Sequence, residues 1–134
     1  MKKLILSLLV AAFVGGNTLS AQTITKNEDG KYSLSVGHVT LTVDAQKGGK
    51  IVSYRYDDKE ILSQTKIPNS FGSTFWTSPQ SEWNWPPVPE YDTKPFNAEV
   101  AGDKLILTGE KSKRFGYRVR KELTTDKKDN AIVI

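Results

Sequence analysis

The sequence predicts an all-β fold built from antiparallel strands. Apolar and polar residues alternate over most of residues 32–123, turn residues such as Gly and Asp separate the alternating segments, and no segment sustains a helical apolar period. Alternation with a period of two is typical of antiparallel sheets that bury one face and leave the other in water. No internal repeat or interdomain linker is visible, so we expect a β-sandwich.

The expected strands form three hairpins and a final pair. Each begins and ends at a turn signal, such as the segment at residues 44–49, the Asp-Asp-Lys turn at 57–59 and the Gly-Asp turn at 102–103. We expect strands at residues 32–36, 39–43, 50–56, 60–62, 98–101, 104–108, 117–123 and 131–134. In the strand at 117–123, Arg118, Arg120 and Glu122 share the face opposite Tyr117, Val119 and Leu123. We expect that charged row to face solvent, with a polar groove as the alternative.

Residues 1–21 have the features of a secretory signal peptide. Lys2 and Lys3 precede an apolar run at residues 4–14, and a small-residue cleavage site ends at Ala21. The run is too short to span a bilayer, and Gly-Gly-Asn at residues 15–17 argues against a core helix of the mature fold. We therefore expect an exported protein, periplasmic or extracellular, whose mature chain, residues 22–134, has no membrane span.

Composition and motifs exclude several classes of function. The chain has no cysteine, so neither disulfides nor an anchor on an N-terminal cysteine is expected. The formal net charge of +4 falls to 4 − 2 = +2 without Lys2 and Lys3. The basic residues are also scattered, which argues against a protein that binds nucleic acid. Its densest basic run, residues 110–114, is predicted to be a solvated hairpin end. No phosphate loop, metal-binding spacing or nucleophile elbow is present, so no cofactor or metal is expected.

Residues 63–95 form the segment in which we expect function to concentrate. The segment lacks apolar periodicity and is far longer than an ordinary connection. Residues 70–91 hold all three tryptophans and four of the six prolines. Three indoles left in water would expose roughly 600 Å², near the limit for a soluble monomer. Prolines at 86, 87 and 89 predict a stiff loop rather than a helix or a central strand.

Rigid aromatic rings on a stiff loop suit a sugar, because indole faces stack on pyranose C–H groups. We expect Trp76, Trp83, Trp85 and Tyr91 to form the stacking surface, and Gln80, Glu82 and Asn84 to bind hydroxyl groups. Two alternatives are a structural lid over one end of the sandwich and a hot-spot patch for a protein partner.

Several motifs together resemble the sugar-binding galactose mutarotase (aldose 1-epimerase) superfamily, most closely a secreted branch of unknown function. They are Gly-Gly-Lys-Ile-Val-Ser at 48–53, Asp-Asp-Lys-Glu-Ile-Leu at 57–62, Asn-Ser-Phe-Gly at 69–72, the Trp-Pro segment at 74–87, Val-Arg-Lys-Glu-Leu at 119–123 and Asn-Ala-Ile-Val-Ile at 130–134. The resemblance implies an antiparallel β super-sandwich of about twice this length. Residues 22–134 would then be its N-terminal part, with the C-terminal half of the same fold missing, in keeping with the apolar strand that stops at residue 134.

The same resemblance implies a His and a Glu as the acid and base of an epimerase, but neither can be placed in this chain. His38 is the only histidine and is expected to be a packed or surface residue of an early strand. The region of the family's site arginine is occupied by Phe75, Trp76 and Thr77. We therefore favour a secreted carbohydrate-binding protein. One alternative is a sugar-active enzyme, either an epimerase or an accessory domain of a lyase or hydrolase, with Glu82 or Glu90 as its acid or base. The other is an interaction domain of an exported complex.

Overall fold

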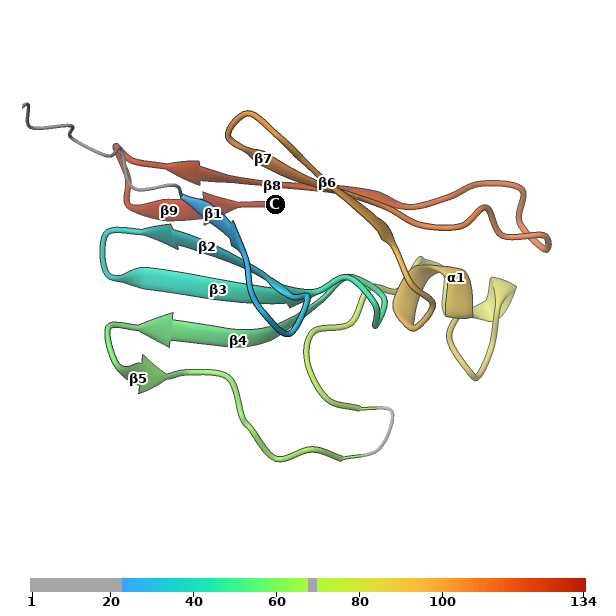
Figure 1. Ribbon diagram of the computed structural model, residues 1–134. Coiled ribbons are helices and arrows are strands. Elements are labelled where there is room, and N and C mark those ends of the chain that lie inside the picture. The colour runs from blue at the N-terminus through green and yellow to red at the C-terminus, as the bar shows by residue number, and fades with distance from the viewer. Residues whose placement is uncertain (1–22, 68–69) are drawn as a thin grey trace, which may run out of the picture.

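The computed structural model describes residues 23–67 and 70–134, and consists mainly of two antiparallel sheets (Figure 1). The five-stranded sheet has the order β1-β2-β3-β4-β5, and the four-stranded sheet has the order β6-β7-β8-β9. Each strand pairs with its neighbour in the chain, so the expected all-β antiparallel architecture is confirmed. The predicted signal peptide, residues 1–21, lies outside the described residues.

The strands are short and are joined mostly by tight turns. The first sheet contains β1 (Ile24–Lys26), β2 (Tyr32–Val36), β3 (Val39–Asp44), β4 (Lys50–Tyr56) and β5 (Lys59–Glu60). The second contains β6 (Asn97–Ala101), β7 (Lys104–Thr108), β8 (Arg120–Asp126) and β9 (Ala131–Val133). Between the sheets in sequence lie a 3₁₀ turn, η1 (Gln80–Glu82), and one turn of helix, α1 (Pro89–Asp92).

The core lies where the two sheets face each other. Leu34 and Val43 from the first sheet, and Leu105 and Leu107 from the second, are all completely buried. Strands β8 and β9 approach β2, which brings the sheets together along one side. Residues 70–96, which we call the aromatic segment, add further residues to the same cluster, namely Trp83, Val88, Tyr91 and Phe96. The segment after β5 therefore closes one end of the sandwich instead of hanging free.

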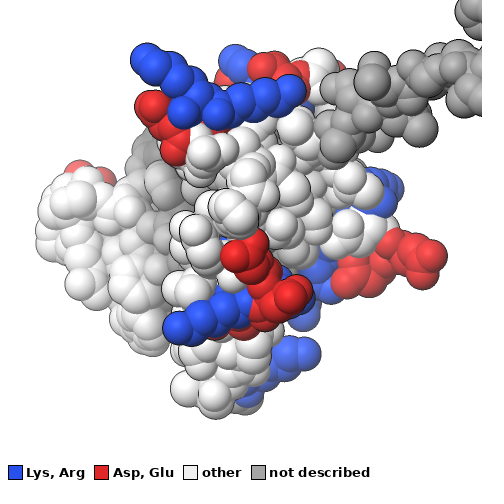
Figure 2. Space-filling model, turned by 90° about the vertical axis from the view of Figure 1, so that its left-hand side faces the viewer, with Lys and Arg blue, Asp and Glu red and all other residues white. Residues whose placement is uncertain are grey.

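The outer face of the five-stranded sheet is polar, as the period-two alternation requires. Ser33 and Thr42 lie opposite each other on β2 and β3 with their hydroxyl oxygens 3.2 Å apart. The next pair along the strands, Ser35 and Thr40, makes the same contact at 3.0 Å. At the turn end of the sheets, to the left in Figure 1, basic and acidic side chains are interspersed (Figure 2).

Most predicted strands are confirmed within a residue or two, and the differences have local causes. β1 was not predicted, because it has three residues and only one buried apolar side chain, Ile24. β5 is shorter than expected and ends at Glu60. The strand predicted from Tyr117 begins only at Arg120, so Arg118 is not part of it. Before Arg120 the chain follows other contacts, since the Tyr117 carbonyl accepts a hydrogen bond from Ser112 N at 2.9 Å.

Two further expectations are wrong. His38 lies in the turn between β2 and β3 and not on a strand, and its exposed ring stacks on Tyr56 with the centroids 5.5 Å apart. The proline-rich stretch contains the helical turn α1, which starts with Pro89 at its first position. The fixed φ of proline suits that position, and the missing N–H would have no partner there in any case.

Candidate functional site

The three tryptophans gather at the closed end of the sandwich but differ in exposure. The Trp76 ring lies edge-on to both others, with centroids 6.0 Å from Trp83 and 5.8 Å from Trp85. Trp83 is only 5% exposed, and its indole Nε1 donates a hydrogen bond to the Thr77 carbonyl at 2.9 Å. Trp76 is 48% and Trp85 69% exposed. Trp83 is thus a core residue, whereas Trp76 and Trp85 present ring surface to solvent.

Tyr91 also belongs to the core. It lies in α1, is 1% exposed, and stacks on Tyr117 with the ring centroids 5.3 Å apart. Its hydroxyl donates to the Tyr117 carbonyl at 3.3 Å, and burial raises the pKa of Tyr91 above its ordinary value. The ring has no free face for a ligand, so the surface available for stacking narrows to Trp76 and Trp85.

The three polar candidates lie beside these rings. Gln80 and Glu82 are the ends of η1, Asn84 follows Trp83, and all three side chains are exposed. Asn84 adopts a left-handed conformation, φ 55°, and its N–H donates to the Gln80 carbonyl at 2.7 Å. Asparagine tolerates this conformation better than most residues. The guanidinium of Arg114, from the β7–β8 connection, donates to the Glu82 carbonyl at 2.6 Å and so holds the turn.

A pocket of about 400 Å³ opens next to Trp85. Its lining combines aromatic and proline rings with charged side chains: Trp83, Trp85, Pro86, Glu90, Lys113 and Arg114 are among its residues. Glu90 pairs with Lys94 at 2.8 Å, and this contact lowers the pKa of Glu90. A general acid at neutral pH needs a raised pKa, so this carboxylate is suited to accepting hydrogen bonds rather than to donating a proton.

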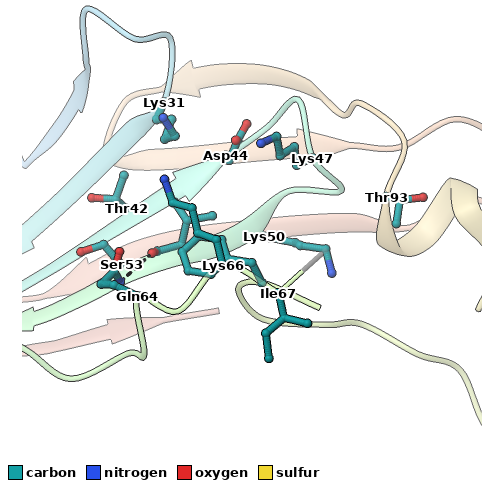
Figure 3. A pocket seen from close by; sticks show the side chains of 12 residues that line it. Lys31, Thr42, Asp44, Lys47, Lys50, Ser53, Gln64, Lys66, Ile67 and Thr93 are labelled. Atoms are coloured by element: carbon teal, nitrogen blue, oxygen red, sulfur yellow. Dashed lines mark hydrogen bonds between the residues drawn. The ribbon is translucent and has the colours of Figure 1, made fainter. Parts of the chain in front are cut away.

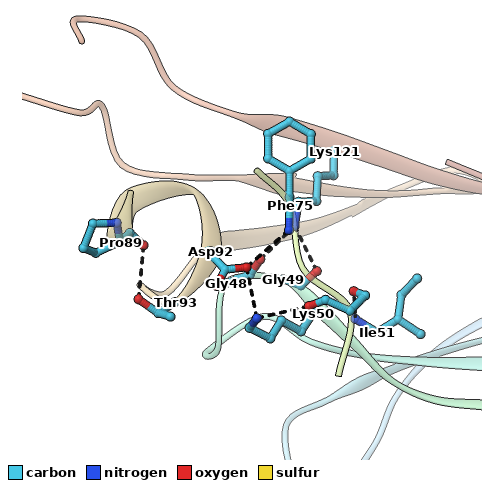
Figure 4. A network of polar contacts seen from close by, with 10 residues as sticks. Gly48, Gly49, Lys50, Ile51, Phe75, Pro89, Asp92, Thr93 and Lys121 are labelled. Atoms are coloured by element: carbon cyan, nitrogen blue, oxygen red, sulfur yellow. Dashed lines mark hydrogen bonds and ion pairs between the residues drawn. The ribbon is translucent and has the colours of Figure 1, made fainter. Parts of the chain in front are cut away.

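A buried polar network anchors both ends of the aromatic segment to the first sheet (Figure 4). Asp92, the last residue of α1, accepts hydrogen bonds at one oxygen from Lys50 Nζ at 3.0 Å and from Phe75 N at 3.2 Å. Lys50 Nζ also donates to the Ser73 carbonyl at 3.1 Å. Ser73 in turn exchanges two hydrogen bonds with the backbone of Ile51, each 2.9 Å long. These contacts fix where the aromatic segment leaves the sheet and where it returns.

Lys121 connects the second sheet to the same place. It lies on β8, donates to the carbonyls of Gly48 and Gly49 at 2.8 and 3.3 Å, and lies over the Phe75 and Phe96 rings. Burial lowers the pKa of Lys121 to about 8. The nearby Lys50 acts in the same direction, and Asp92 opposes both.

A second, larger pocket of about 660 Å³ lies elsewhere, against the first sheet (Figure 3). We call it the lysine pocket, because four lysines line it together with Thr42, Asp44, Val52, Ser53, Gln64, Ile67, Phe71 and Thr93; the lysines are Lys31, Lys47, Lys50 and Lys66. No motif in the sequence indicates this pocket. These lysines are 35 residues apart at the extremes and show no common spacing. They come together through the pairing of β2, β3 and β4 and through the path of the segment after β5, which carries Lys66.

The network around Lys50, Asp92 and Lys121 was missed for a related reason. Its one sequence signal is the Gly48-Gly49 pair, which the resemblance marked as part of a hairpin motif. Gly48 has φ +69°, and a Cβ there would lie 1.9 Å from the Asp92 carbonyl oxygen. The glycine thus marks a close approach between two backbones that the linear sequence separates by 44 residues.

Two further findings concern the described residues only. None of the helices in residues 23–67 and 70–134 has the length and apolar character needed to cross a membrane. In the same ranges, no three acidic or histidine side chains gather closely enough to hold a metal ion. Comparison with family models, with curated proteins and with solved structures found no match for this chain.

Proposed function

We propose that the protein is an exported carbohydrate-binding protein of galactose mutarotase-like fold, which holds a sugar ring against Trp76 and Trp85. One observation carries the proposal: the indole of Trp85 is 69% exposed although it lines a pocket. The ring is also in edge contact with Trp76. A large aromatic ring exposed to this extent costs solubility. A ligand that covers the indole would explain why this position has an exposed tryptophan.

The surroundings of Trp85 are stiff, which favours binding. Pro86 and Pro87 follow it directly, and the backbone before it is held by Arg114 through the Glu82 and Trp83 carbonyls. Behind Trp76 lies the buried ring of Trp83. A surface that is already ordered loses little conformational entropy when a ligand binds. The flat C–H face of a pyranose can therefore stack on it at low cost.

Polar side chains close to Trp85 in sequence and in the adjoining pocket could bind the hydroxyl groups of a stacked sugar. Gln80, Glu82 and Asn84 are exposed on the same turn as Trp85. Glu90 and Lys113 line the adjoining pocket, whose volume lies in the range of about 300 to 1,000 Å³ that is usual for small-molecule sites. An apolar face flanked by a few hydrogen-bonding groups is the arrangement that recognises a sugar.

The test is a fluorescence titration of the purified protein with neutral mono- and oligosaccharides. Two of the three indoles lie in the proposed site, so a bound sugar is expected to shift the emission saturably. Trp85→Ala and Trp76→Ala should each abolish the shift. Tyr56→Ala removes an aromatic ring that is 53% exposed on β4, and it should leave the titration unchanged.

The opposite result would be no saturable response to any sugar in a protein whose cooperative unfolding shows that it is folded. The exposed rings of Phe75, Trp76 and Trp85 would then be better explained as a contact patch for a protein partner.

A further inference from the structure

We propose that the lysine pocket is a second binding site, for an acidic saccharide: a sugar that carries carboxylate or sulfate groups. This inference rests on residues that the aromatic site does not use. It therefore stands or falls independently of the function proposed for Trp76 and Trp85.

The four lysines reach the pocket from separate parts of the fold. Lys31 directly precedes β2, Lys47 lies in the turn between β3 and β4, Lys50 opens β4, and Lys66 lies in the segment after β5. Surface lysines on one strand or turn are common. Four that converge on one hollow from four segments are a feature of the tertiary structure. Those without an acidic partner add positive potential to the same space.

Acidic side chains neutralise only part of the positive charge of the pocket. Two of the lysines have acidic partners, Lys31 with Asp29 at 2.5 Å and Lys50 with Asp92 at 3.0 Å. Within the described part of the chain, no carboxylate lies at ion-pair distance from Lys47 or Lys66. Asp44 is the acidic residue in the lining, and one of its oxygens accepts a hydrogen bond from Gln46 N at 3.0 Å. Two ammonium groups with no fixed partner are thus left to bind an anion.

The remaining lining favours a sugar over a simple anion. Thr42 and Ser53 contribute hydroxyl oxygens that can accept from a ligand, since the Ser53 hydroxyl already donates to Glu60 and the Thr42 hydroxyl contacts Ser33. The amide nitrogen of Gln64 donates to the carbonyls of Val52 and Leu62, which leaves its oxygen to accept. Val52, Ile67 and Phe71 add apolar surface. A volume of about 660 Å³ is far more than an inorganic anion fills. A sugar acid offers what this mixture needs: an anionic group, several hydroxyls and an apolar ring face.

Isothermal titration calorimetry at low salt tests the proposal with two probes of equal length, a trimer of galacturonic acid and a neutral trimer of galactose. The acidic trimer is expected to bind, and its affinity should fall as salt screens the lysines. Lys47→Gln/Lys66→Gln should weaken it by about tenfold or more, since two charge-assisted contacts are lost. Lys127→Gln/Lys128→Gln makes the same charge change in the exposed β8–β9 turn and is expected to have no comparable effect.

Three results would overturn the inference: equal affinity for the neutral trimer, an equal loss in the two double variants, or competition by sulfate or a short glutamate peptide at the concentration of the acidic trimer. The last would indicate a site for anions in general. Repeating the titration on Trp85→Ala separates the two sites, because the acidic trimer should still bind there. All the substituted lysines are exposed, so the variants should fold, and urea unfolding checks that they do.

Discussion

Lys50 Nζ lies 3.0 Å from an oxygen of Asp92, and both side chains are more than nine-tenths buried. The two residues are 42 positions apart, one at the start of β4 and the other at the end of α1. Because Asp92 also accepts from Phe75 N and Lys50 also donates to the Ser73 carbonyl, the pair joins the sheet to both ends of the aromatic segment. The exposed tryptophans are positioned by a contact that is itself shielded from water.

Removing either partner of this pair should destabilise the protein strongly. Asp92→Ala and Lys50→Met each leave one buried charge without a partner, so we expect the free energy of unfolding to fall by about 3 to 5 kcal/mol. Because the two residues interact directly, the double variant should lose clearly less than the sum of the single losses. Urea unfolding followed by circular dichroism measures all three.

The exposed pair Lys104–Glu122 provides the control, since it also joins a lysine to a carboxylate across two segments, at 3.2 Å. Lys104→Met, which breaks this pair, should change the free energy of unfolding by no more than about 1 kcal/mol. If Lys50→Met behaved like Lys104→Met, the buried network would not be what holds the aromatic segment.

Gly48 should not tolerate a side chain. Gly48 and Gly102 have nearly the same backbone conformation, φ +69° and +63°, but only Gly48 has a neighbour where the Cβ would go, the Asp92 carbonyl at 1.9 Å. Gly102→Ala should therefore cost only the left-handed strain, about 1 to 2 kcal/mol. Gly48→Ala must in addition displace α1 from the sheet, and we expect at least twice that loss in urea unfolding. Equal losses would mean that the close contact relaxes without cost.

The strands could be predicted from sequence because their signal is local. Tyr32, Leu34 and Val36 alternate with small polar residues, and the observed β2 has the same bounds. Hairpin partners follow from the turns between them, as with Gly102 between β6 and β7. The bounds of the strands were predicted less well where tertiary contacts determine the path of the chain. Before Arg120, the Tyr117 carbonyl accepts hydrogen bonds from the Tyr91 hydroxyl and from Ser112 N, and the chain does not extend β8. No local sequence pattern indicates these contacts.

The candidate site was predicted only at the level of the segment. Aromatic and proline content pointed to the segment between β5 and β6, but the sequence could not distinguish Trp83, which fills the core, from Trp85, which is exposed. The distinction depends on tertiary packing, because Trp83 belongs to the same buried cluster as Val88 and Tyr91, and Trp85 does not. The lysine pocket could not be predicted from sequence, since its residues come together through the pairing of β2 to β4 and through the segments on either side of these strands.

The different roles of Trp83 and Trp85 lead to opposite expectations for stability. Trp83→Ala removes a buried indole together with its hydrogen bond to the Thr77 carbonyl, and should cost about 3 to 5 kcal/mol. Trp85→Ala removes a ring that is 69% exposed and should cost less than about 1 kcal/mol. Urea unfolding followed by circular dichroism compares them without relying on indole emission. A large loss in Trp85→Ala would make that ring structural and weaken its assignment to ligand binding.

Lys121 should make the stability of the protein depend on pH in the alkaline range. Burial lowers its pKa to about 8 in the folded protein, from the ordinary 10.5 of an exposed lysine. Between these values the unfolded chain binds more protons at this position than the folded one. The free energy of unfolding contributed by Lys121 therefore rises as pH increases from about 8 to 10.5, and is level below that window.

Lys121→Met isolates this contribution. The methionine keeps apolar contact with Phe75 and Phe96 but cannot titrate. As pH rises from about 8 to 10.5, the free energy of unfolding of the unsubstituted protein should therefore increase relative to that of the variant. Lys127→Met, in the exposed β8–β9 turn, should give a difference that stays level over the same range. The measurement is urea unfolding at a series of pH values. A level difference for Lys121→Met as well would show that the ammonium group keeps its proton, held by the carbonyls of Gly48 and Gly49, and that burial does not govern its titration.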